Sequence, residues 1–568
     1  MKITRIGPFV LCCVATVLAP AQQTPNRAAP LEQTIRYFSE DGLWNGSVLV
    51  ARGGQVIFNK AYGFANFEWK TPNTPDTVYR IASVTKQFTA AAILLLEQRA
   101  RLEGTGDLKV EDRLKKYLPD IPASWGEITL HHLLSHTSGI PAYTTRRKRW
   151  TEELSLKQMI ELVRDLPLDF KPGTEYRYDN SGFFLLGAVI EKVSGQSYEK
   201  FIQENIFRPL GMKSTGYDDP EAVVPHRAQG YNRIRPGEYE NASFMDMSVP
   251  YSAGALHSTT ADLLKWQQAL YGGDLLDASE LAKMTTPTIK ESGYGLVIDT
   301  DHGRKRYSHS GGINGFNSFL AYYPDDKLTV VCLSNTKSPT TRVAGYLGAA
   351  AHGDVVGLPK NVEVSVESLR PYVGEYGDAK SPRLKASLEN GRLLFKSGGL
   401  VDYPIVESDS TFFDRTTAAE LTFLRNTTGA VTSVSIHQNG VVKEYPRLPS
   451  SGAPMPGPGL TGKWDATFTW MNGTQHTIFT FDVKGNTFSG TLASKGSDRS
   501  LRFTDGKIEG NQISFQVSER QKTPPNSSYT GTLEGGQLRL IYRNTAPRPP
   551  STDRGGNIHL MIATRVSD

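Results

Sequence analysis

The chain has 568 residues, too many for one typical hydrophobic core, so we expect two to four domains. Its 38% hydrophobic and 21% charged residues are ordinary for globular proteins. The 63 basic and 58 acidic residues leave a formal charge of only +5, which gives no reason to expect a nucleic-acid partner.

Residues 1–21 have the pattern of a cleavable signal peptide. A basic start at 1–5 precedes an apolar stretch at 9–18, and 19–21 reads Ala-Pro-Ala, an A-x-A cleavage site. The apolar stretch is too short to cross a bilayer as a helix, so we expect no stable membrane insertion after cleavage. The sequence therefore predicts a periplasmic or extracellular protein, with an uncleaved anchor as the alternative.

The next region, residues 22–357, predicts strands at both ends with helices between them. Apolar runs around a Gly-Gly turn predict a hairpin at 47–58. Helical periodicity then predicts helices at 84–99, 155–165, 182–194, 198–207, 260–271 and 339–352. Short apolar runs predict strands at 293–299, 305–310, 316–324 and 328–334. We expect one antiparallel sheet, closed by the two terminal segments and covered by helices.

After residue 358 the helical periodicity disappears. Short apolar runs alternate with Gly, Asn and Asp turns over 366–448, which predicts an all-β domain. Residues 449–459 are rich in Pro, Gly and Ser and predict a linker. A second all-β domain follows at 460–568. The predicted fold class is α+β, with a helix-flanked antiparallel sheet followed by two small barrel-like β domains.

A serine and a lysine one helical turn apart are the first candidate catalytic residues. Ser83 opens the predicted helix at 84–99, and Lys86 lies on the same face, within hydrogen-bond reach. A serine hydroxyl needs a neighbour to take its proton, and an exposed lysine is already protonated at pH 7. We therefore expect Lys86 to be partly buried or to lie near another cation.

Two later motifs complete the candidate site. Tyr178, followed by Asp179 and Asn180, offers a phenol that can pass a proton to a leaving group, and an amide that can orient Lys86. His309-Ser310-Gly311-Gly312 predicts a strand edge against which an acyl substrate can lie. We expect the backbone N–H groups of Ser83 and Gly312 to form an oxyanion hole.

Each motif alone is weak, because the chain also carries decoys. Ser197 and Lys200 repeat the Ser-x-x-Lys spacing, and 396–398 imitates the third motif. Order, spacing and flanking helices distinguish the chosen set.

With these motifs in place, residues 31–356 resemble the superfamily of class C serine β-lactamases, DD-peptidases and related esterases and D-aminopeptidases. The segments 131–141 and 253–263 are similar to two further motifs of that family. The resemblance implies that Ser83, Lys86 and Tyr178 are catalytic and that Asn180, His309 and Gly311 line the site. It implies neither a metal nor an organic cofactor. The 460–568 region resembles the small lipocalin-like barrels often appended to this family.

Two positions depart from the family pattern. Asp179 stands where the family commonly has Ser or Ala, which places a carboxylate beside the site. His309 replaces the lysine common in β-lactamases, and a histidine is mostly neutral at pH 7, whereas the lysine suits a substrate carboxylate. Strong β-lactam turnover is therefore not expected.

Other reactive side chains are interpreted as structural. His132 and His136 have a spacing that could hold a metal, but no H-E-x-x-H motif accompanies them, so we expect histidines bonded to the backbone. Cys332 lies in an apolar run and is predicted to be buried in a strand.

The sequence thus predicts an exported serine hydrolase that forms an acyl-enzyme on Ser83. The first interpretation is an esterase or amidase acting on small acyl compounds or on substrates that contain D-amino acids. A DD-peptidase or weak β-lactamase acting on peptidoglycan-derived substrates is the second. A catalytically silent binding protein is the third. The physiological substrate, the role of the two β domains and the oligomeric state stay open.

Overall fold

The computed structural model describes residues 28–566, with gaps at 105–107, 148–149, 356, 379–380, 398–399, 418, 439–440, 449–459, 471–472, 498, 510–511, 518–526, 535–536 and 545–557. The predicted signal peptide and the predicted linker at 449–459 lie outside the described residues. The chain divides into two compact units. The first comprises residues 1–373 and 383–445, and the second comprises 374–382 and 446–568.

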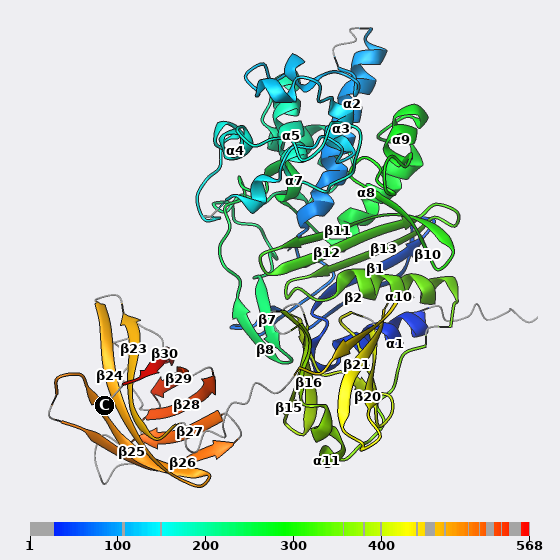
Figure 1. The fold of residues 1–568 in the computed structure, drawn as a ribbon. Helices are drawn as coiled ribbons and strands as arrows, with labels where there is room; N and C mark the ends of the chain where they lie inside the picture. The colour runs from blue at the N-terminus through cyan, green and yellow to red at the C-terminus, as the bar shows by residue number, and fades with distance from the viewer. Residues whose placement is uncertain are drawn as a thin grey trace, which may run out of the picture. The chain divides into compact units, whose positions relative to one another are not determined.

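A six-stranded antiparallel sheet forms the centre of the first unit (Figure 1). Its order is β10 (Val297–Asp301), β11 (Arg304–Ile313), β12 (Phe316–Tyr323), β13 (Leu328–Ser334), β1 (Gly46–Arg52) and β2 (Gln55–Tyr62). Strand β1 of the N-terminal hairpin pairs antiparallel with β13, and Val48 lies opposite Cys332. Both ends of the region therefore close one sheet, as the sequence predicts.

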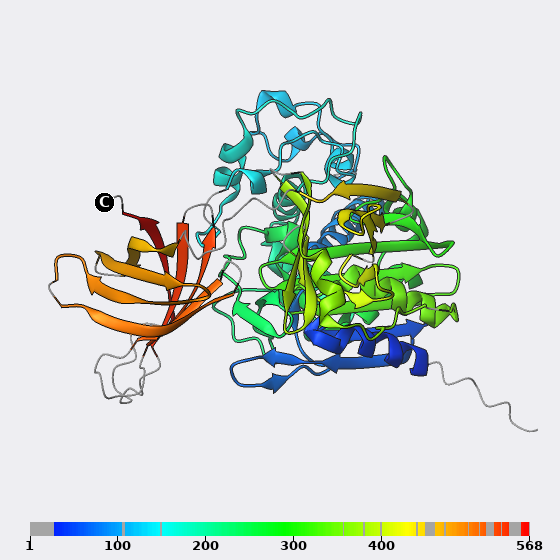
Figure 2. The same cartoon turned by 60° about the horizontal axis from the view of Figure 1, so that its bottom comes forward.

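Helices cover both faces of this sheet, as Figures 1 and 2 show. On one side lie α2 (Thr85–Leu102), α3 (Leu130–Leu134), α4 (Leu156–Val163), α5 (Ser181–Ser194), α6 (Tyr198–Ile202), α7 (Tyr251–Gly254), α8 (Thr260–Gly272) and α9 (Ala278–Thr285). On the other side, α1 (Ala28–Ser39) and α10 (Thr340–His352) pack against each other, and α10 packs on β12 and β13. Each layer has its own buried apolar core.

Several short strands pair outside the central sheet. They are β3 (Phe64–Asn66) with β4 (Thr71–Pro72), β7 (Tyr231–Arg235) with β8 (Glu238–Asn241), and the three-stranded set β5 (Tyr79–Arg80), β9 (Leu256–Ser258) and β6 (Gly216–Tyr217). A 3-10 turn, η2 (Ala82–Val84), joins β5 to α2.

Two predicted elements differ from the structure. The strand predicted at 293–299 begins only at Val297, because Gly295 turns the backbone at a φ of +66°. The helix predicted at 198–207 continues beyond α6 as a π-helical turn over Gln203–Phe207. Ser83 lies in the 3-10 turn η2, which leads directly into α2, and not in the α-helix itself.

The first β region belongs to the same unit as the sheet. It contains α11 (Val366–Leu369), the antiparallel series β15 (Ser381–Glu389), β16 (Arg392–Ser397) and β17 (Leu400–Asp402), and a five-stranded sheet of β18 (Ile405–Val406), β19 (Thr411–Asp414), β20 (Ala419–Arg425), β21 (Val431–Gln438) and β22 (Val441–Pro446). The fully buried side chain of Arg415 connects this region to α1, donating to the Tyr37 carbonyl at 3.3 Å and to Asp41 at 3.0 Å. On the strand β7, Arg233 donates to Asp402 at 3.1 Å.

The second unit contains β14 (Gly374–Asp378) and a closed barrel of eight antiparallel strands. The barrel strands are β23 (Gly462–Trp470), β24 (Gly473–Lys484), β25 (Thr487–Ser494), β26 (Leu501–Glu509), β27 (Gln512–Val517), β28 (Ser527–Glu534), β29 (Gln537–Asn544) and β30 (Ile558–Arg565). Pairing of β23 with β30 closes it. Buried aromatic side chains fill its interior, with the Phe515 ring stacked on Tyr529 at 4.8 Å.

The predicted α+β fold class is confirmed, and the last β domain is a closed barrel. The exact domain boundaries and the likeness of the barrel to lipocalins stay predictions. Among the described residues, no helix combines the length and the apolar character needed to cross a bilayer.

Candidate active site

The turn that carries Ser83 is strained and tightly packed. Ala82 has a φ of +46°, and such a conformation costs about 1–3 kcal/mol in a residue other than glycine. Ser318 holds the turn by donating its hydroxyl to the Ile81 carbonyl at 2.6 Å. A Cβ on Gly311 would stand 2.3 Å from that same carbonyl oxygen. Because Gly311 has no side chain, β11 can pack directly against the turn that carries Ser83.

Lys86 is fully buried behind Ser83 and has three hydrogen-bond acceptors. Its Nζ lies 2.8 Å from Asn180 Oδ1, 2.8 Å from the Ala253 carbonyl oxygen and 3.2 Å from Ser83 Oγ. In the neutral amine the two shorter contacts take the two hydrogens. The lone pair of Nζ then points at the Ser83 hydroxyl, which is the geometry of a general base.

Burial gives Lys86 a pKa suited to this task. The loss of solvation lowers the pKa of Lys86 to about 7, and the Asp179 carboxylate opposes part of this decrease. The sequence predicts that Lys86 is partly buried or near another cation, and the structure shows it to be buried. A base works best when its pKa is near the working pH.

Tyr178 lies next to both Ser83 and Lys86, with the Lys86 Nζ 4.9 Å from the centre of its ring. Its hydroxyl donates to Ser83 Oγ at 2.8 Å, and desolvation raises the pKa of the phenol although 40% of the residue is exposed. Tyr178 therefore stays protonated at neutral pH and can relay a proton, whereas Lys86 is the group that can accept one.

The entry of α5 positions this part of the site. Asp179 Oδ1 accepts from the Gly182 N–H at 2.7 Å, so the carboxylate caps the helix. Only 3% of the surface of Asp179 is exposed, so this side chain faces inward. Asn180, the next residue, turns its amide oxygen to Lys86 as the sequence predicts.

His309, Gly311 and Gly312 lie on β11, as predicted, but β11 is only partly an edge strand. Its pairing with β10 ends at Ser308, so the outer edge is unpaired with β10 from His309 onward. His309 bonds neither Ser83 nor Lys86, and its Nδ1 lies 2.6 Å from the Ser310 carbonyl oxygen. Burial and the nearby Lys86 lower the pKa of His309 to about 3. Gly312 lies beside Ser83.

Two hollows meet at Ser83 and Gly312. The first, of about 350 Å³, is lined by those two residues and by Tyr176, Tyr178, His136, His309, Ser310, Ser292, Leu296 and Val297. The second, of about 290 Å³, is lined by them and by Ala82, Asn180, Ala253, Gly254, Pro250, Trp150, Tyr143, Thr144, Met245, Ile313 and Asn314. Among the described residues that line either hollow, none is an Asp, Glu, Arg or Lys.

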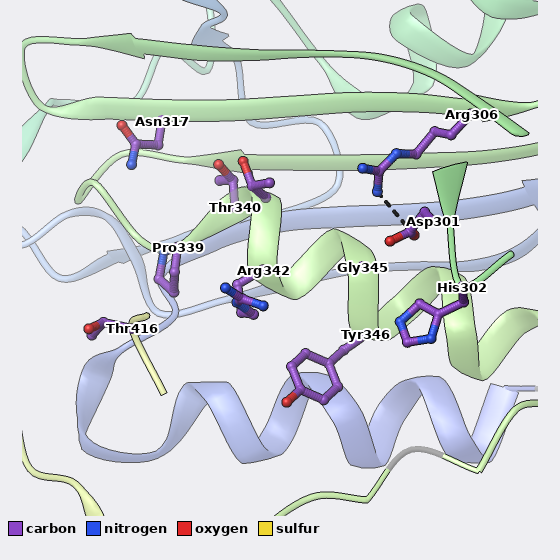
Figure 3. A pocket seen from close by; sticks show the side chains of 11 residues that line it. Asp301, His302, Arg306, Asn317, Pro339, Thr340, Arg342, Gly345, Tyr346 and Thr416 are labelled. Atoms are coloured by element: carbon purple, nitrogen blue, oxygen red, sulfur yellow. Dashed lines mark ion pairs between the residues drawn. The ribbon is translucent and has the colours of Figure 1, made fainter. Parts of the chain in front are cut away.

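A larger hollow of about 480 Å³ lies beside α10 (Figure 3). Its charged pair is Arg306 with Asp301, 3.0 Å apart, and Arg306 also binds Asp299 at 2.7 Å. The Arg306 guanidinium is thus paired with two carboxylates. No described nucleophile with an adjacent base lines the hollow. The smaller hollows at Ser83 are therefore the candidate active site.

The structure adds residues that sequence reasoning did not select. His136 was interpreted as a structural histidine, and its Nδ1 does accept from the Asp179 N–H at 3.3 Å, but its ring also lines the hollow. The Ala253 carbonyl that binds Lys86 also was not selected. Both lie in the two extra family-like segments, which is the signal that could have found them. His132 and Cys332 have the predicted structural roles, in a helix cap and a buried strand.

Comparison with known proteins agrees with this geometry. Residues 31–353 match the family described as Beta-lactamase, which is more than half of the chain. The chain belongs to this family. A sequence relative of this β-lactamase-family hydrolase is Penicillin-binding protein 4* of Bacillus subtilis, 29% identical over 456 residues that cover 74% of this chain and 99% of the relative.

Two solved structures share the fold. The octameric penicillin-binding protein homologue from Pyrococcus abyssi has a TM-score of 0.52 and 24% identity, and the match covers 87% of this chain and 98% of that one. The D-amino acid amidase from Ochrobactrum anthropi has a TM-score of 0.52 and 22% identity, covering 58% and 99%. These two structures show the shared fold, and the family match over residues 31–353 identifies the chain as a β-lactamase-related serine hydrolase.

Proposed function

We propose that this hydrolase is an exported enzyme that forms an acyl-enzyme on Ser83 and cleaves esters or amides of small acyl compounds or of D-amino acids. The observation that carries the proposal is the environment of Lys86. A fully buried amine, with two acceptors at 2.8 Å, directs its lone pair at the hydroxyl of Ser83.

The acylation step follows from these positions. Lys86 takes the proton of the Ser83 hydroxyl while Oγ forms a bond to the substrate carbonyl carbon. The bond to the leaving group then breaks, and the leaving nitrogen or oxygen takes the Tyr178 proton. The Lys86 ammonium, whose Nζ lies 4.9 Å from the centre of the Tyr178 ring, then returns its proton to the Tyr178 phenolate oxygen. Water reverses the same steps and releases the acid.

The charge that develops on the substrate oxygen needs donors. We assign this role to the backbone N–H groups of Ser83 and Gly312, which border both hollows. Removing one such donor typically lowers the rate by about 10²–10³.

The linings favour uncharged substrates. Trp150, Met245 and Ile313 give the second hollow an apolar wall for an acyl group. In the first hollow a neutral His309 stands in place of the family's lysine. A substrate carboxylate would lose its hydration there without gaining an ion-pair partner among the described residues.

The test combines covalent labelling with turnover. A fluorophosphonate is expected to label the wild-type enzyme, and Ser83→Ala is expected to abolish both labelling and hydrolysis of nitrophenyl acetate. Ser197→Ala is the matched control, because Ser197 belongs to the second Ser-x-x-Lys and only caps α6. It is expected to keep both activities.

Fluorescent penicillin distinguishes the alternatives. Ser83-dependent labelling by both reagents would favour a DD-peptidase or weak β-lactamase, the interpretation that the penicillin-binding relatives support. Absence of any Ser83-dependent adduct or turnover would overturn the proposal and leave a silent binding protein.

A further inference from the structure

The position of Tyr178 shows which hollow receives the leaving group. Tyr178 lines only the first hollow, while Ser83 and Gly312 line both. Under the proposed function Tyr178 donates the proton to the leaving group, so that group must lie in the first hollow. We call it the leaving-group hollow.

His136 presents a hydrogen-bond donor there. The Asp179 N–H donates to its Nδ1 at 3.3 Å, and the Arg177 N–H donates to its carbonyl oxygen at 3.0 Å. Burial lowers the pKa of His136, so the ring is neutral. Asp179 Oδ2 stands 3.8 Å from Nδ1, beyond hydrogen-bond distance, so the Asp179 N–H is the partner of Nδ1 and the ring hydrogen lies on Nε2. No described residue binds that nitrogen, although the ring lines the hollow and contacts the Tyr178 ring in a tilted arrangement, with the ring centres 4.6 Å apart.

His309 presents the opposite character. Its Nδ1 donates to the Ser310 carbonyl oxygen at 2.6 Å, which leaves the Nε2 of the neutral ring as an acceptor. No described residue binds this nitrogen either. The leaving-group hollow therefore contains one fixed donor and one fixed acceptor, both uncharged.

We propose that this hollow recognises an uncharged amide in the leaving group, with His136 Nε2–H donating to the amide oxygen and His309 Nε2 accepting from the amide N–H. An amide supplies both partners, whereas a carboxylate supplies none for His309 and would be buried without a cation. The inference rests on the proposed function, because it assumes acyl transfer from this hollow to Ser83.

Two esters that differ in one group test the inference. The phenylacetyl esters of glycolamide and of glycolate have the same scissile bond and acyl group, but their leaving alcohols carry a carboxamide or a carboxylate. Wild-type kcat/KM is expected to be at least about tenfold higher for the glycolamide ester. The N,N-dimethylglycolamide ester, which lacks the N–H, is expected to lose about three- to tenfold, the typical effect of one neutral hydrogen bond.

Variants then assign the residues. His136→Phe keeps a ring against Tyr178 but removes the donor, so the glycolamide to glycolate ratio is expected to fall about three- to tenfold. His131→Phe, in the same segment but bonded to Tyr294, is the matched control and is expected to keep the wild-type ratio. His309→Lys is expected to shift the preference toward glycolate.

Three results would overturn the inference. They are equal or reversed wild-type preference, no loss on dimethylation, and a His136→Phe ratio equal to that of the wild type. A purely structural defect in His136→Phe would lower both esters by one factor and leave the ratio unchanged. Ser83-dependent hydrolysis of nitrophenyl acetate separates these outcomes from failure of the proposed function, since it needs no amide.

Discussion

In the unit that contains Ser83, buried charged side chains connect elements far apart in the sequence, whereas aromatic rings build the interior of the barrel. Lys86 and Arg415 are both fully buried, and each binds groups from other elements. The barrel core holds Phe515 against five other aromatic rings. In the first unit, buried polar side chains thus join distant elements beside two apolar cores, whereas the barrel is stabilised mainly by apolar burial.

The first β region is part of the unit that contains Ser83, whereas the barrel is part of the other unit. Both show the same alternation of short strands and turns in the sequence. The first is tied to α1 and β7 by Arg415 and Arg233, and the loop after β8 leads to Met245 in the wall of the second hollow. We therefore expect the first region to affect catalysis and the barrel to be dispensable for it.

The largest expected effect is at Lys86. Lys86→Met removes the base while keeping an apolar stem of similar length, and general acid–base catalysis typically contributes about 10²–10⁴ in rate. The kcat for nitrophenyl acetate is expected to fall by that factor. A loss smaller than tenfold would show that another group accepts the proton.

Arg415→Met tests whether buried charge stabilises the first unit. Asp41, whose side chain is 25% exposed, would keep Arg392 as a partner, so the expected cost is that of a lost hydrogen bond to a charged group, about 1.5–3 kcal/mol. The urea midpoint for loss of esterase activity is expected to drop accordingly. Arg370→Met, at an exposed pair with Glu367, is the control and should leave it near the wild-type value.

Phe515→Ala tests whether apolar burial stabilises the barrel. Removing a buried phenylalanine typically costs about 3–5 kcal/mol. Calorimetry is expected to show a lower-temperature transition for the barrel, with esterase turnover at 25 °C unchanged. If the activity midpoint moved together with that transition, the two units would unfold as one.

The pH dependence of kcat/KM tests whether Lys86 is the general base. Because burial lowers the pKa of Lys86 to about 7, the neutral base is lost as the pH falls below that value. The kcat/KM for nitrophenyl acetate is expected to fall about tenfold per pH unit below 7 and to be level above it. A level profile down to pH 5 would contradict the assignment of Lys86.

The smallest effect is expected at an exposed ion pair of the barrel. Lys495 lowers the pKa of Asp465, so this interaction is present at neutral pH and weakens as the pH falls. Exposed pairs contribute about 0–1 kcal/mol, so Asp465→Asn is expected to shift barrel unfolding by less than about 1 kcal/mol. A decrease in unfolding free energy as large as that expected for Arg415→Met would contradict the prediction that exposed ion pairs contribute less than buried ones.

Local signals in the sequence were enough for the fold class and for the three motifs. Periodicity found the strands of the sheet, and the spacing of Ser83 and Lys86 placed amine and hydroxyl 3.2 Å apart. Contacts between distant segments could not be found in this way. The Ala253 carbonyl on Lys86 and the His136 ring on Tyr178 depend on how remote loops fold together, and backbone groups carry no residue signature.

Two glycines bracket the nucleophile. A Cβ at Gly311 would strike the carbonyl of Ile81, and one at Gly295 would stand 2.5 Å from the carbonyl of Lys86. Even a methyl group at either site would shift Ser83 relative to its base. Variants designed for a new substrate range should therefore keep Gly295 and Gly311. Substitutions at Trp150 and Leu296, which line the two hollows, are the better choice.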